Sequence, residues 1–449
     1  MRFGTDGVRG RAHSELTEAM ASDLGRAIAR VFFGTPAVIG GDSRESTPAF
    51  ISAVSNGLLD GGSRVETLGI VPTPIVAAEA SRTGAIGVVI SASHNPYYDN
   101  GIKVFGPGGA KLSTDVEAQI EAEWHSSSIP GALPTERNSV VEGDAAAIQN
   151  RYLDRMSSSI ERRSLNGMRV VIDAANGAAS ELAGEVFASV GADVIVMNAD
   201  PDGTNINDDC GATHTAGLQS AVLSYGADVG LALDGDADRL IAVDHQGNVV
   251  DGDRVIAILA ADMRSRGALV DDTVVVTVMA NLGFHRAMNT AGIRVLETPV
   301  GDRHVLEALV DGGFSLGGEQ SGHIIIPQHA TTGDGMLTGV VLLDAVMRSG
   351  RSLAELSATS MTSFPQVLVN VEVPVRGEVP EDAIREVRAE LEAELGDDGR
   401  ILIRPSGTEP LVRVMVEAAD QCDAERIATM LADEIRSAFE PTDEQGDEE

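Results

Sequence analysis

Three short apolar runs in this sequence each end in a cluster of polar and small residues. The runs cover residues 86–90, 229–233 and 314–316, and the clusters that follow them contain Ser93, Asp234 and Glu319. A short apolar run bounded by turn signals is typical of a buried strand. Because ligands of open α/β sheets bind beyond the carboxyl ends of the strands, we expect one fold used three times, with three strand ends that form one composite site.

Helix and strand patterns alternate around these runs and change in character near residue 365. Expected helices cover 16–33, 47–59 and 180–190, and expected strands cover 37–40, 64–68, 169–173, 193–197 and 274–278. The later pattern is a strand over 367–373, a helix over 381–395, strands over 401–403 and 411–416, and a helix over 423–439. Alternation of the first kind indicates α/β domains, whereas the last section indicates a smaller α+β layer.

A chain of 449 residues exceeds a single hydrophobic core and is expected to divide into several domains. We predict three similar mixed α/β sandwich domains followed by a smaller C-terminal α+β domain and a disordered acidic tail. Their boundaries are 1–148, 149–250, 251–363, 364–440 and, for the tail, 441–449. Each of the four domains contributes one polar loop to the expected site.

The formal net charge of −35 is extreme. An acidic surface repels nucleic acid and anionic membranes. The sequence has no run of about eighteen apolar residues and no apolar segment typical of a signal peptide at its start. Its two cysteines cannot form a disulfide framework, which fits a reducing compartment. We therefore predict a cytoplasmic protein with no nucleic-acid partner and no membrane partner.

Charge repulsion on this scale destabilises a compact fold at low ionic strength. The Debye length falls from about 30 Å at 0.01 M salt to about 3 Å at 1 M, so molar salt screens the repulsion. This favours the hypothesis of a halophilic protein adapted to high internal salt. An acidic protein without such adaptation is the alternative, and a melting temperature that does not rise with salt would support it.

Lysine occurs only twice, at positions 103 and 111, and the other cationic side chains are arginines. A surface lysine can be replaced by arginine, whereas a lysine that transfers a proton cannot, because arginine stays charged. Lys103, ten residues after Ser93, is therefore a candidate functional residue. Lys111 follows a glycine-rich loop, and we expect its side chain to be exposed.

The first cluster, SASHNP, places the hydroxyl of Ser93 at a strand end with a histidine beside it. Serine is a weak nucleophile and requires activation by a base, a metal or prior chemistry. A polar connection without function is the alternative. The opening segment FGTDGVRG contains one cation, Arg9, and its glycines fit either a close approach to an anion or a plain turn.

The second cluster, DGDADR, places carboxylates at three alternate positions, Asp234, Asp236 and Asp238. Mg²⁺ prefers oxygen ligands in an octahedral shell, and this loop supplies three of them. A calcium-binding EF-hand would need glycine and glutamate where the chain has Arg239 and His245. An aspartyl nucleophile of the dehalogenase type usually has threonine or valine where Asp238 stands. An acidic surface turn remains the alternative, although the apolar strand before it disfavours that interpretation.

Two later loops contain groups that suit a phosphorylated sugar. In the segment GEQSGH, Glu319 and Ser321 suit hydrogen bonds to sugar hydroxyls, and His323 suits proton transfer near neutral pH. A loop histidine satisfied by local hydrogen bonds is the alternative for His323. The segment RPSGTEP, with Arg404 and the later Arg413, offers guanidinium groups, hydroxyls and a glycine backbone to a phosphate monoester. A rigid turn with solvated arginines is the alternative there.

Four motifs together resemble the α-D-phosphohexomutase superfamily, in the expected order and over nearly the whole chain. They are SASHNP at 91–96, DGDADR at 234–239, GEQSGH at 318–323 and RPSGTEPLV at 404–412. The opening FGTDGVRG, the third motif with its Gln320, and the segment TTGDG at 331–335 are most similar to the branch that acts on glucosamine phosphates. The resemblance implies four domains in a heart-shaped arrangement around one cleft.

The resemblance also implies a role for each motif. Ser93 would carry a phosphoryl group, and phosphorylated Ser93 would bind one Mg²⁺ together with the three aspartates Asp234, Asp236 and Asp238. Lys103 and His323 would assist proton transfer, with Arg9 in support. The residues that would bind substrate are Arg239, Glu319, Ser321, Arg404, Ser406, Gly407, Thr408 and Arg413.

The implied reaction interconverts glucosamine 6-phosphate and glucosamine 1-phosphate and feeds UDP-N-acetylglucosamine synthesis. It passes through a phosphoserine enzyme and a 1,6-bisphosphate, with glucosamine 1,6-bisphosphate or a similar bisphosphate as activator. The partner is a phosphorylated hexose or hexosamine, and a homodimer is the assembly that the resemblance allows. The first alternative is an enzyme that isomerises glucose or mannose phosphates by the same mechanism. The second is a metal-dependent sugar-phosphate phosphatase or a non-catalytic sugar-phosphate binder.

Overall fold

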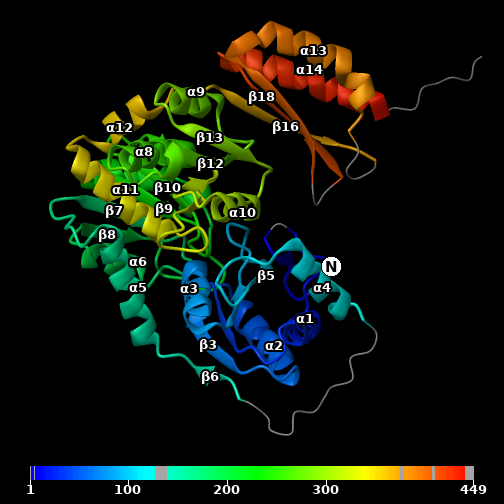
Figure 1. Cartoon of the computed structure of the whole chain (residues 1–449), viewed down its shortest axis with the longest axis vertical. Coiled ribbons are helices and arrows are strands. Elements are labelled where there is room, and N and C mark those ends of the chain that lie inside the picture. Colours follow the sequence, from blue (N-terminus) through cyan, green and yellow to red (C-terminus); the bar gives the residue numbers. More distant parts are fainter. Residues whose placement is uncertain (1, 5, 127–138, 375–378, 407–409, 440–449) are drawn as a thin grey trace, which may run out of the picture. The chain divides into compact units, whose positions relative to one another are not determined.

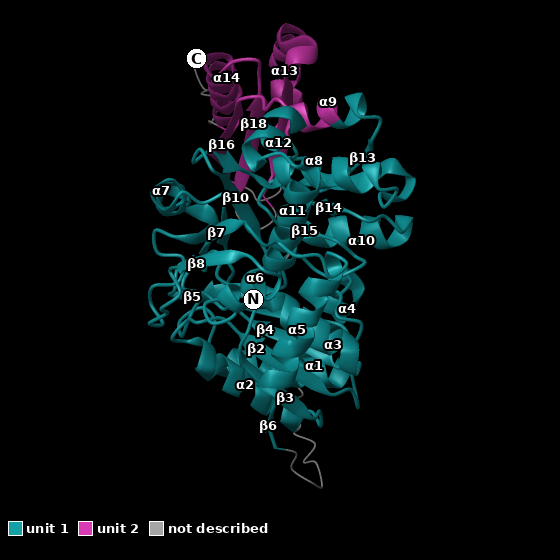
Figure 2. Ribbon diagram, turned by 90° about the vertical axis from the view of Figure 1, so that its left-hand side faces the viewer, with its two compact units in different colours: residues 1–280, 288–360 teal, residues 281–287, 361–449 magenta. Residues whose placement is uncertain are grey.

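The computed structural model describes residues 2–4, 6–126, 139–374, 379–406 and 410–439. The chain forms two compact units (Figure 2). Unit 1 is Met1–Ala280 with Met288–Ser360, and unit 2 is Asn281–Ala287 with Met361–Glu449. The described residues form four β-sheets, three in unit 1 and one in unit 2. The boundaries expected for four domains stay a prediction, and the tail at 441–449 lies outside the described residues.

The first sheet has the strand order β1-β5-β4-β2-β3-β6 (Figure 1). Its strands are β1 (Val8–Arg11), β2 (Ala37–Gly41), β3 (Val65–Ile70), β4 (Ile86–Ile90), β5 (Asp99–Phe105) and β6 (Val141–Glu142). Its helices are α1 (Glu18–Val31), α2 (Thr47–Asp60), α3 (Thr73–Thr83) and α4 (Thr114–Trp124). All five residues of β4 are buried, as expected of a strand covered on both faces by helices. The side chain of Thr17 accepts the backbone N–H of Met20 and so caps α1.

The second sheet has the order β11-β10-β9-β7-β8. Its strands are β7 (Arg169–Asp173), β8 (Asp193–Met197), β9 (Val229–Leu233), β10 (Leu240–Asp244) and β11 (Val249–Val250). Its helices are α5 (Ala145–Ser159), α6 (Ala183–Ser189) and α7 (Ala216–Tyr225), with the 3₁₀ turn η1 (Gly211–Thr213). Strands β9 and β10 are buried along their whole length, which leaves their connecting loop at the end of a rigid pair.

The third sheet has the order β13-β12-β14-β15. Its strands are β12 (Thr273–Thr277), β13 (Arg294–Thr298), β14 (Gly317–Gly318) and β15 (Ile324–Ile325). Its helices are α8 (Gly252–Ser265), α10 (Asp302–Gly312), α11 (Gly335–Ser349) and α12 (Leu353–Ser360), with the 3₁₀ turn η2 (Val270–Asp272). Helix α9 (Leu282–Thr290) has its first residues in unit 2 and its last three in unit 1. The strand expected at 314–316 is wrong: the strand here is β14, and of the three expected residues only Leu316 bonds the sheet, through its carbonyl to the backbone N–H of Val275 at 3.1 Å.

The fourth sheet, in unit 2, has the order β16-β18-β17. Its strands are β16 (Gln366–Glu372), β17 (Arg400–Pro405) and β18 (Leu411–Glu417). Its helices are α13 (Glu381–Leu395) and α14 (Gln421–Phe439), with the 3₁₀ turn η3 (Gly396–Asp398). The two helices lie side by side along one face of the sheet (Figure 1), where Ile384, Val414 and Ile427 form part of the core. Leu368, on β16, is 48% exposed.

The three sheets of unit 1 repeat one pattern. Each contains three parallel strands and an antiparallel fourth, in the orders β3-β2-β4-β5, β8-β7-β9-β10 and β13-β12-β14-β15. The expectation of one α/β fold used three times is therefore confirmed. The sequence pattern did not predict the antiparallel strands β5, β10 and β15. Each pairs with the parallel strand before it, so that a hairpin loop connects the two. Among the described helices, none combines the length and the apolar character needed to span a bilayer.

Candidate active site

The three polar clusters of unit 1 lie in the three hairpin loops, and the structure brings them together. Ser93 follows β4, Asp234 follows β9, and His323 precedes β15. The hydroxyl of Ser93 donates to Asp234 Oδ2 at 2.5 Å, and His323 Nδ1 lies 3.5 Å from Asp238 Oδ1. Residues separated by more than two hundred positions therefore meet at the carboxyl ends of three buried strands.

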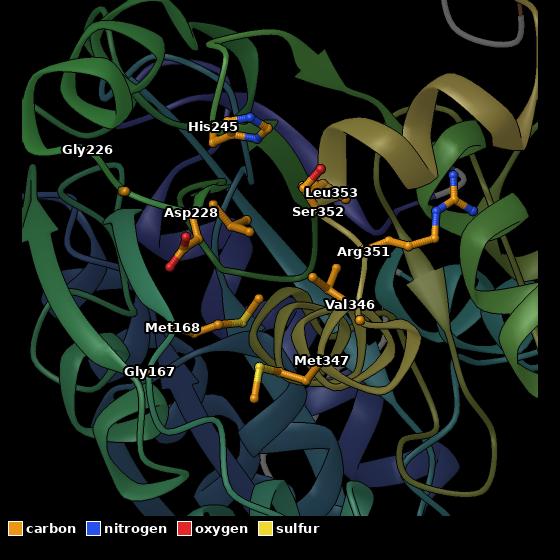
Figure 3. A pocket seen from close by; sticks show the side chains of 13 residues that line it. Gly167, Met168, Gly226, Asp228, His245, Val346, Met347, Arg351, Ser352 and Leu353 are labelled. Atoms are coloured by element: carbon orange, nitrogen blue, oxygen red, sulfur yellow. The ribbon is translucent and has the colours of Figure 1, made fainter.

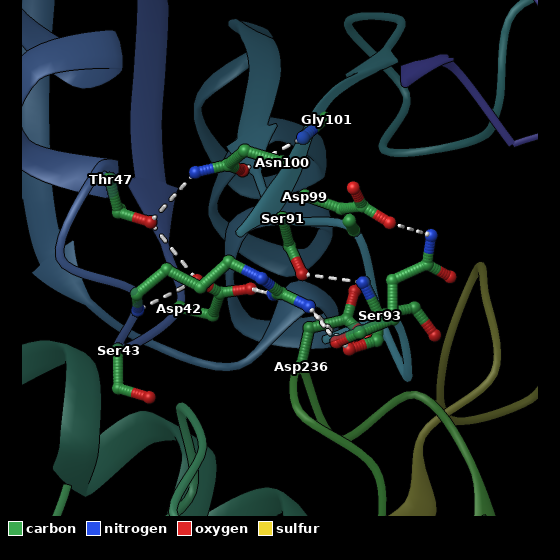
Figure 4. A network of polar contacts seen from close by, with 12 residues as sticks. Asp42, Ser43, Thr47, Ser91, Ser93, Asp99, Asn100, Gly101 and Asp236 are labelled. Carbon is green, nitrogen blue, oxygen red and sulfur yellow. Dashed lines mark hydrogen bonds and ion pairs between the residues drawn. The ribbon is translucent and has the colours of Figure 1, made fainter. Parts of the chain in front are cut away.

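Ser93 is fully buried and has a φ of 54°, a left-handed conformation that is strained for any residue with a side chain. The backbone carbonyl of Ser93 accepts hydrogen bonds from Arg44 at 3.2 Å and from Asn207 at 2.9 Å. The same two side chains bond the carbonyl of Asn95, at 2.6 and 3.1 Å. Arg44 is itself held by Asp42 (Figure 4). This network fixes the loop in a conformation that it would not adopt alone.

A histidine lies against the hydroxyl of Ser93. His94 Nδ1 is 3.2 Å from Ser93 Oγ. Burial, together with the charges of Arg239 and Arg9, lowers the pKa of His94 to about 4. The imidazole is therefore neutral at physiological pH, and its Nδ1 lies within hydrogen-bond distance of Ser93 Oγ.

The aspartate loop forms a buried acidic triad next to Ser93. Asp234, Asp236 and Asp238 are at most 3% exposed, and one ligand oxygen from each lies within 4.8 Å of the others. Burial and repulsion by the other two carboxylates raise the pKa of Asp234 to about 8. A Cβ at Gly235 would lie 2.6 Å from the carbonyl oxygen of Ser93, so only glycine allows the two loops to approach this closely.

The triad fits a hard divalent cation. Asp236 Oδ1 is buried and has no hydrogen-bond partner among the described residues. Its other oxygen accepts hydrogen bonds from Thr73 Oγ1 at 2.6 Å and from Lys103 Nζ at 2.8 Å. A cation would relieve the repulsion that raises the pKa of Asp234. An oxygen-only donor set of this kind is the set that Mg²⁺ prefers.

Lys103 lies on β5 and is only 2% exposed. Its Nζ is 2.8 Å from Asp236 Oδ2, 3.1 Å from Asp238 Oδ2 and 3.0 Å from Asp6 Oδ2. Burial by itself would lower the pKa of Lys103, but the three carboxylates outweigh it and raise that pKa well above its usual value. The side chain predicted from the scarcity of lysine is therefore in the site, as an ammonium group.

The expectation that Lys111 is exposed is wrong. Its side chain is 7% exposed, and Nζ lies 2.6 Å from Asp6 Oδ1 and also pairs with Asp302. The loop after β5 turns back on itself, because the backbone N–H of Gly106 bonds the carbonyl of Ala110. Lys111 consequently forms a bridge with Phe105 and returns to the site beside Lys103.

The other predicted site residues of unit 1 lie around this centre. Arg9, on β1, donates to the carbonyl of Ala92 at 3.2 Å and pairs with Asp6. Arg239 Nε is 3.8 Å from Asp238 Oδ1. Burial lowers the pKa of Arg239, but nearby carboxylates, Glu319 among them, raise it by more, so Glu319 acts electrostatically on the aspartate loop.

The β14–β15 loop holds its side chains by local bonds. Glu319 Oε1 accepts the backbone N–H of Gly301 at 3.2 Å, and Ser321 is exposed. His323 is 2% exposed, and its Nε2 lies 3.1 Å from the backbone nitrogen of Gly333 and 3.3 Å from Asp302 Oδ2. A neutral imidazole can accept the backbone N–H of Gly333 at Nε2, whereas an imidazolium can donate its Nε2–H to Asp302.

The predicted phosphate loop lies in unit 2, between β17 and β18. Arg404 and Arg413 are directly opposite each other in the antiparallel register. Such pairs share a face of the sheet, and like charges at opposed positions are destabilising. Ser406 is buried, and its backbone N–H bonds the carbonyl of Leu411 at 2.7 Å. The predicted residues Gly407 and Thr408 lie outside the described residues.

Several residues of the site were not found from the sequence. They are Asp6, Arg44, Thr73, Asn207 and Asp302. Each is a polar residue in a loop or at a helix end, and each acts on a residue distant in the chain. Two signals were available: the polar segment at 41–44 directly after a predicted strand, which contains Arg44, and the opening segment FGTDGVRG, which contains Asp6.

A cavity of about 550 Å³ lies at the other end of the second sheet (Figure 3). Its lining includes Met168 and Asp228, which precede β7 and β9, and His245, Met347 and Arg351. Asp234 follows the opposite, carboxyl end of β9. Among the described residues, none of the predicted site residues lines this cavity, so it is separate from the acidic triad.

The chain matches the family models of all four phosphoglucomutase/phosphomannomutase domains. The α/β/α domains I, II and III match residues 1–129, 150–247 and 251–364, and the C-terminal domain matches 368–434. The chain therefore belongs to the phosphoglucomutase/phosphomannomutase family. The resemblance to phosphohexomutases inferred from four motifs is thus confirmed.

Individual relatives cover almost the whole chain. A phosphoglucosamine mutase of Mycolicibacterium gilvum is 51% identical over 441 residues, which are 96% of this chain and 98% of the relative. A phosphoglucomutase/phosphomannomutase family protein from Burkholderia thailandensis has a similar structure, with a TM-score of 0.79, 24% identity and 97% of each chain covered. The N-acetylphosphoglucosamine mutase of Aspergillus fumigatus, solved with GlcNAc-6P and magnesium, has a TM-score of 0.71 at 19% identity, over 98% of this chain and 96% of that one. These two structural likenesses support the fold.

Proposed function

We propose that this chain is a phosphoglucosamine mutase, which interconverts glucosamine 6-phosphate and glucosamine 1-phosphate. The observation that carries the proposal is the contact of 2.5 Å between Ser93 Oγ and Asp234 Oδ2 inside a buried acidic triad. The contact supports Ser93 as the phosphoryl acceptor, because its hydroxyl lies beside three carboxylates that could hold a cation. The identity of 51% to a curated phosphoglucosamine mutase over nearly the full chain supports the choice of sugar.

In the proposed cycle, Ser93 is phosphorylated at the start and at the end. The phosphoryl group passes from Ser93 Oγ to the 1-hydroxyl of glucosamine 6-phosphate, so that the Oγ–P bond breaks, an O1–P bond forms, and the hydroxyl proton passes to a base. The resulting 1,6-bisphosphate turns over in the site. Its 6-phosphoryl group then returns to Ser93 Oγ, the sugar oxygen recovers a proton, and glucosamine 1-phosphate leaves. Added glucosamine 1,6-bisphosphate, or a similar bisphosphate, serves as activator.

One Mg²⁺ is the proposed metal. Asp234, Asp236 and Asp238 would hold it together with an oxygen of phosphorylated Ser93, and these residues offer the oxygen-only donor set already described. When bound, Mg²⁺ neutralises charge on the phosphoryl group that is transferred, which is the main electrostatic requirement of such reactions.

Lys103 and His323 are the proposed proton-transfer residues. They lie on two sides of Asp238, at 3.1 Å and 3.5 Å from its oxygens. Arg9 supports them through Asp6, which also contacts Lys103. Both candidates are buried, so water is largely excluded from the proton path.

Substrate binding is proposed for the remaining predicted residues. Glu319 and Ser321 would hold sugar hydroxyls, and Arg239 would face the phosphoryl group. The phosphate that does not react would be bound in unit 2 by Arg404, Ser406, Gly407, Thr408 and Arg413. The opposed arginines of β17 and β18 support that assignment, because they form a surface that favours an anion.

The setting of the enzyme is also proposed. We propose a cytoplasmic protein that acts on free sugar phosphates, has no nucleic-acid or membrane partner, and can assemble into a homodimer. Its four domains would end near residues 148, 250, 363 and 440. The net charge of −35 supports adaptation to high salt.

The test is a comparison of three substrates. Isomerisation of glucosamine 6-phosphate, glucose 1-phosphate and mannose 1-phosphate is measured in molar KCl with Mg²⁺ and a catalytic amount of the matching bisphosphate. We expect the highest kcat/KM for glucosamine 6-phosphate. A preference for glucose or mannose phosphate would retain the Ser93 mechanism and overturn the choice of sugar. Release of inorganic phosphate without isomerisation would overturn the mutase proposal itself.

A further inference from the structure

Six side chains of unit 1 form a closed ring of ionic contacts at the site. In order around the ring they are Asp6, Lys103, Asp238, His323, Asp302 and Lys111. The ring draws residues from all three α/β parts of unit 1: Asp6, Lys103 and Lys111 from the first, Asp238 from the second, and Asp302 and His323 from the third. Two members, Lys111 and Asp302, have no part in the proposed reaction, although each contacts residues next to the proton-transfer groups.

Lys111 and Asp302 connect the two proposed proton-transfer residues. Asp6 uses one oxygen for each lysine, with Oδ1 at 2.6 Å from Lys111 Nζ and Oδ2 at 3.0 Å from Lys103 Nζ. Asp302 Oδ2 lies between Lys111 Nζ and His323 Nε2, at 3.3 Å from the latter. Lys111 therefore shares one carboxylate with each proton-transfer residue: Asp6 with Lys103 and Asp302 with His323. Its contacts with these carboxylates help to set the positions of Lys103 and His323.

The burial of Lys111 makes these contacts rigid. Its side chain is 7% exposed and that of Asp302 is 10% exposed. Burial lowers the pKa of Lys111, but Asp302 and Asp6 outweigh it and keep the group an ammonium ion. The chain has only two lysines, and both are in this ring. A compact ammonium group can be shared between two carboxylates, as Lys111 is between Asp6 and Asp302.

We propose that Lys111 and Asp302 are positioning residues. Lys111 holds Lys103 through Asp6, and Asp302 holds His323 directly, in the geometry that the mutase reaction requires. The inference rests on the proposed function and adds two residues to it. Neither residue touches the reacting atoms. Their effect is on the orientation of groups that do, and an error of about 1 Å in such groups can cost about 100-fold in rate.

The competing explanation is a purely structural ion pair between two parts of unit 1. A neighbouring pair provides the control for it. Arg303 follows Asp302 on α10 and pairs with Glu117 of α4, and both side chains are 11% exposed. That pair joins α10 to α4, whereas Lys111 lies just before α4. Among the described residues it makes no hydrogen bond or ion pair with the six ring residues. Glu117 also lies in the electrostatic field of Lys111. Both ring residues stay in place when the Arg303 pair is lost, so that loss measures the structural cost of an ion pair at this position.

The experiment compares Lys111→Met, Asp302→Asn, the double variant and the control Arg303→Met in the full chain. For each, kcat and KM for glucosamine 6-phosphate are measured together with the melting temperature. We expect kcat to fall about 100-fold in both single variants with KM unchanged. In the control Arg303→Met, the melting temperature should fall but kcat should not. The double variant removes one cation and one anion, so neither charge is left without its partner. Its melting temperature should therefore be higher than that of the single variants, but its kcat should stay low.

A spectroscopic readout separates this inference from the proposed function. In long-range ¹H–¹⁵N spectra of the nine histidines, the ring nitrogens of His323 should shift in Asp302→Asn and stay unchanged in Arg303→Met. This measurement needs no turnover. Unshifted His323 signals, or a kcat that recovers with stability in the double variant, would overturn the positioning role. A wild-type chain that isomerises none of the three sugars would instead overturn the proposed function.

Discussion

The two candidate binding regions of this chain differ in how they are built. Around Ser93, in unit 1, the polar groups are buried and each is held by partners distant in the sequence. In unit 2, Arg404 and Arg413 are half-buried neighbours on one small sheet. In the proposed function, the first arrangement would fix atoms for bond making, whereas the second would present charge to a ligand. The difference predicts that substitutions in unit 1 act on kcat and those in unit 2 act on KM.

The largest effect is expected at the hydroxyl itself. Ser93→Ala removes the only oxygen that carries the phosphoryl group in the proposed cycle, so isomerisation should fall to background. The fold should remain, because the network that holds the loop bonds its backbone carbonyl rather than the hydroxyl. Activity assays, a thermal melt and calorimetric binding of glucosamine 6-phosphate check this. Retained turnover would remove Ser93 from the mechanism.

The acidic triad should come next. Asp236→Asn should weaken Mg²⁺ binding and lower kcat by at least about 100-fold, because the site loses one anionic ligand. Chelation of the wild-type enzyme should abolish activity, and added Mg²⁺ should restore it. The control is Asp244→Asn, since Asp244 is a buried aspartate that closes a turn by accepting bonds from Asn248. If both variants lost Mg²⁺ affinity equally, the triad would not be a specific site.

In unit 2 the expected effect is on substrate affinity. Arg413→Met should raise KM about 10- to 100-fold with little change in kcat, because one charge-assisted hydrogen bond to phosphate is lost. Arg400→Met is the matched control, since Arg400 lies at the other end of β17 and pairs with Glu417 at 2.6 Å. A fall in kcat alone for Arg413→Met would contradict the division between the two regions.

A smaller effect is expected when hydrogen bonds that hold the Ser93 loop are removed. Asn207→Ala removes two hydrogen bonds to the carbonyls of Ser93 and Asn95. Relaxation of the strained loop should lower kcat about 10-fold and leave KM for the sugar phosphate unchanged. Steady-state kinetics check this, with Asn248→Ala as a control in a turn remote from the loop. An unchanged kcat would show that Arg44 alone suffices.

The smallest and most general effect concerns salt. The melting temperature should rise between low salt and molar KCl, since screening reduces repulsion across a chain of net charge −35. Ser93→Ala should show the same increase, because the effect does not depend on the site. A melting temperature independent of salt would exclude adaptation to high salt.

The sequence predicted those parts of the site that depend on local pattern. The apolar runs at 86–90 and 229–233 are strands with those bounds, and the polar clusters after them meet in space. The burial of Lys111 could not be predicted, because it depends on a loop that folds back and on Asp302, almost two hundred residues away. The strand at 314–316 was misplaced because β14 consists of two glycines, which carry no strand signal.

The burial of both lysines has a practical consequence for protein chemistry. Reagents that acylate primary amines react with lysine only when the amine is accessible and deprotonated, and here both ammonium groups are enclosed by carboxylates. In the folded protein these two residues should resist acylation, and they should become reactive when the ring opens. The rate at which they are labelled, followed by mass spectrometry, would therefore report the opening of the site residue by residue.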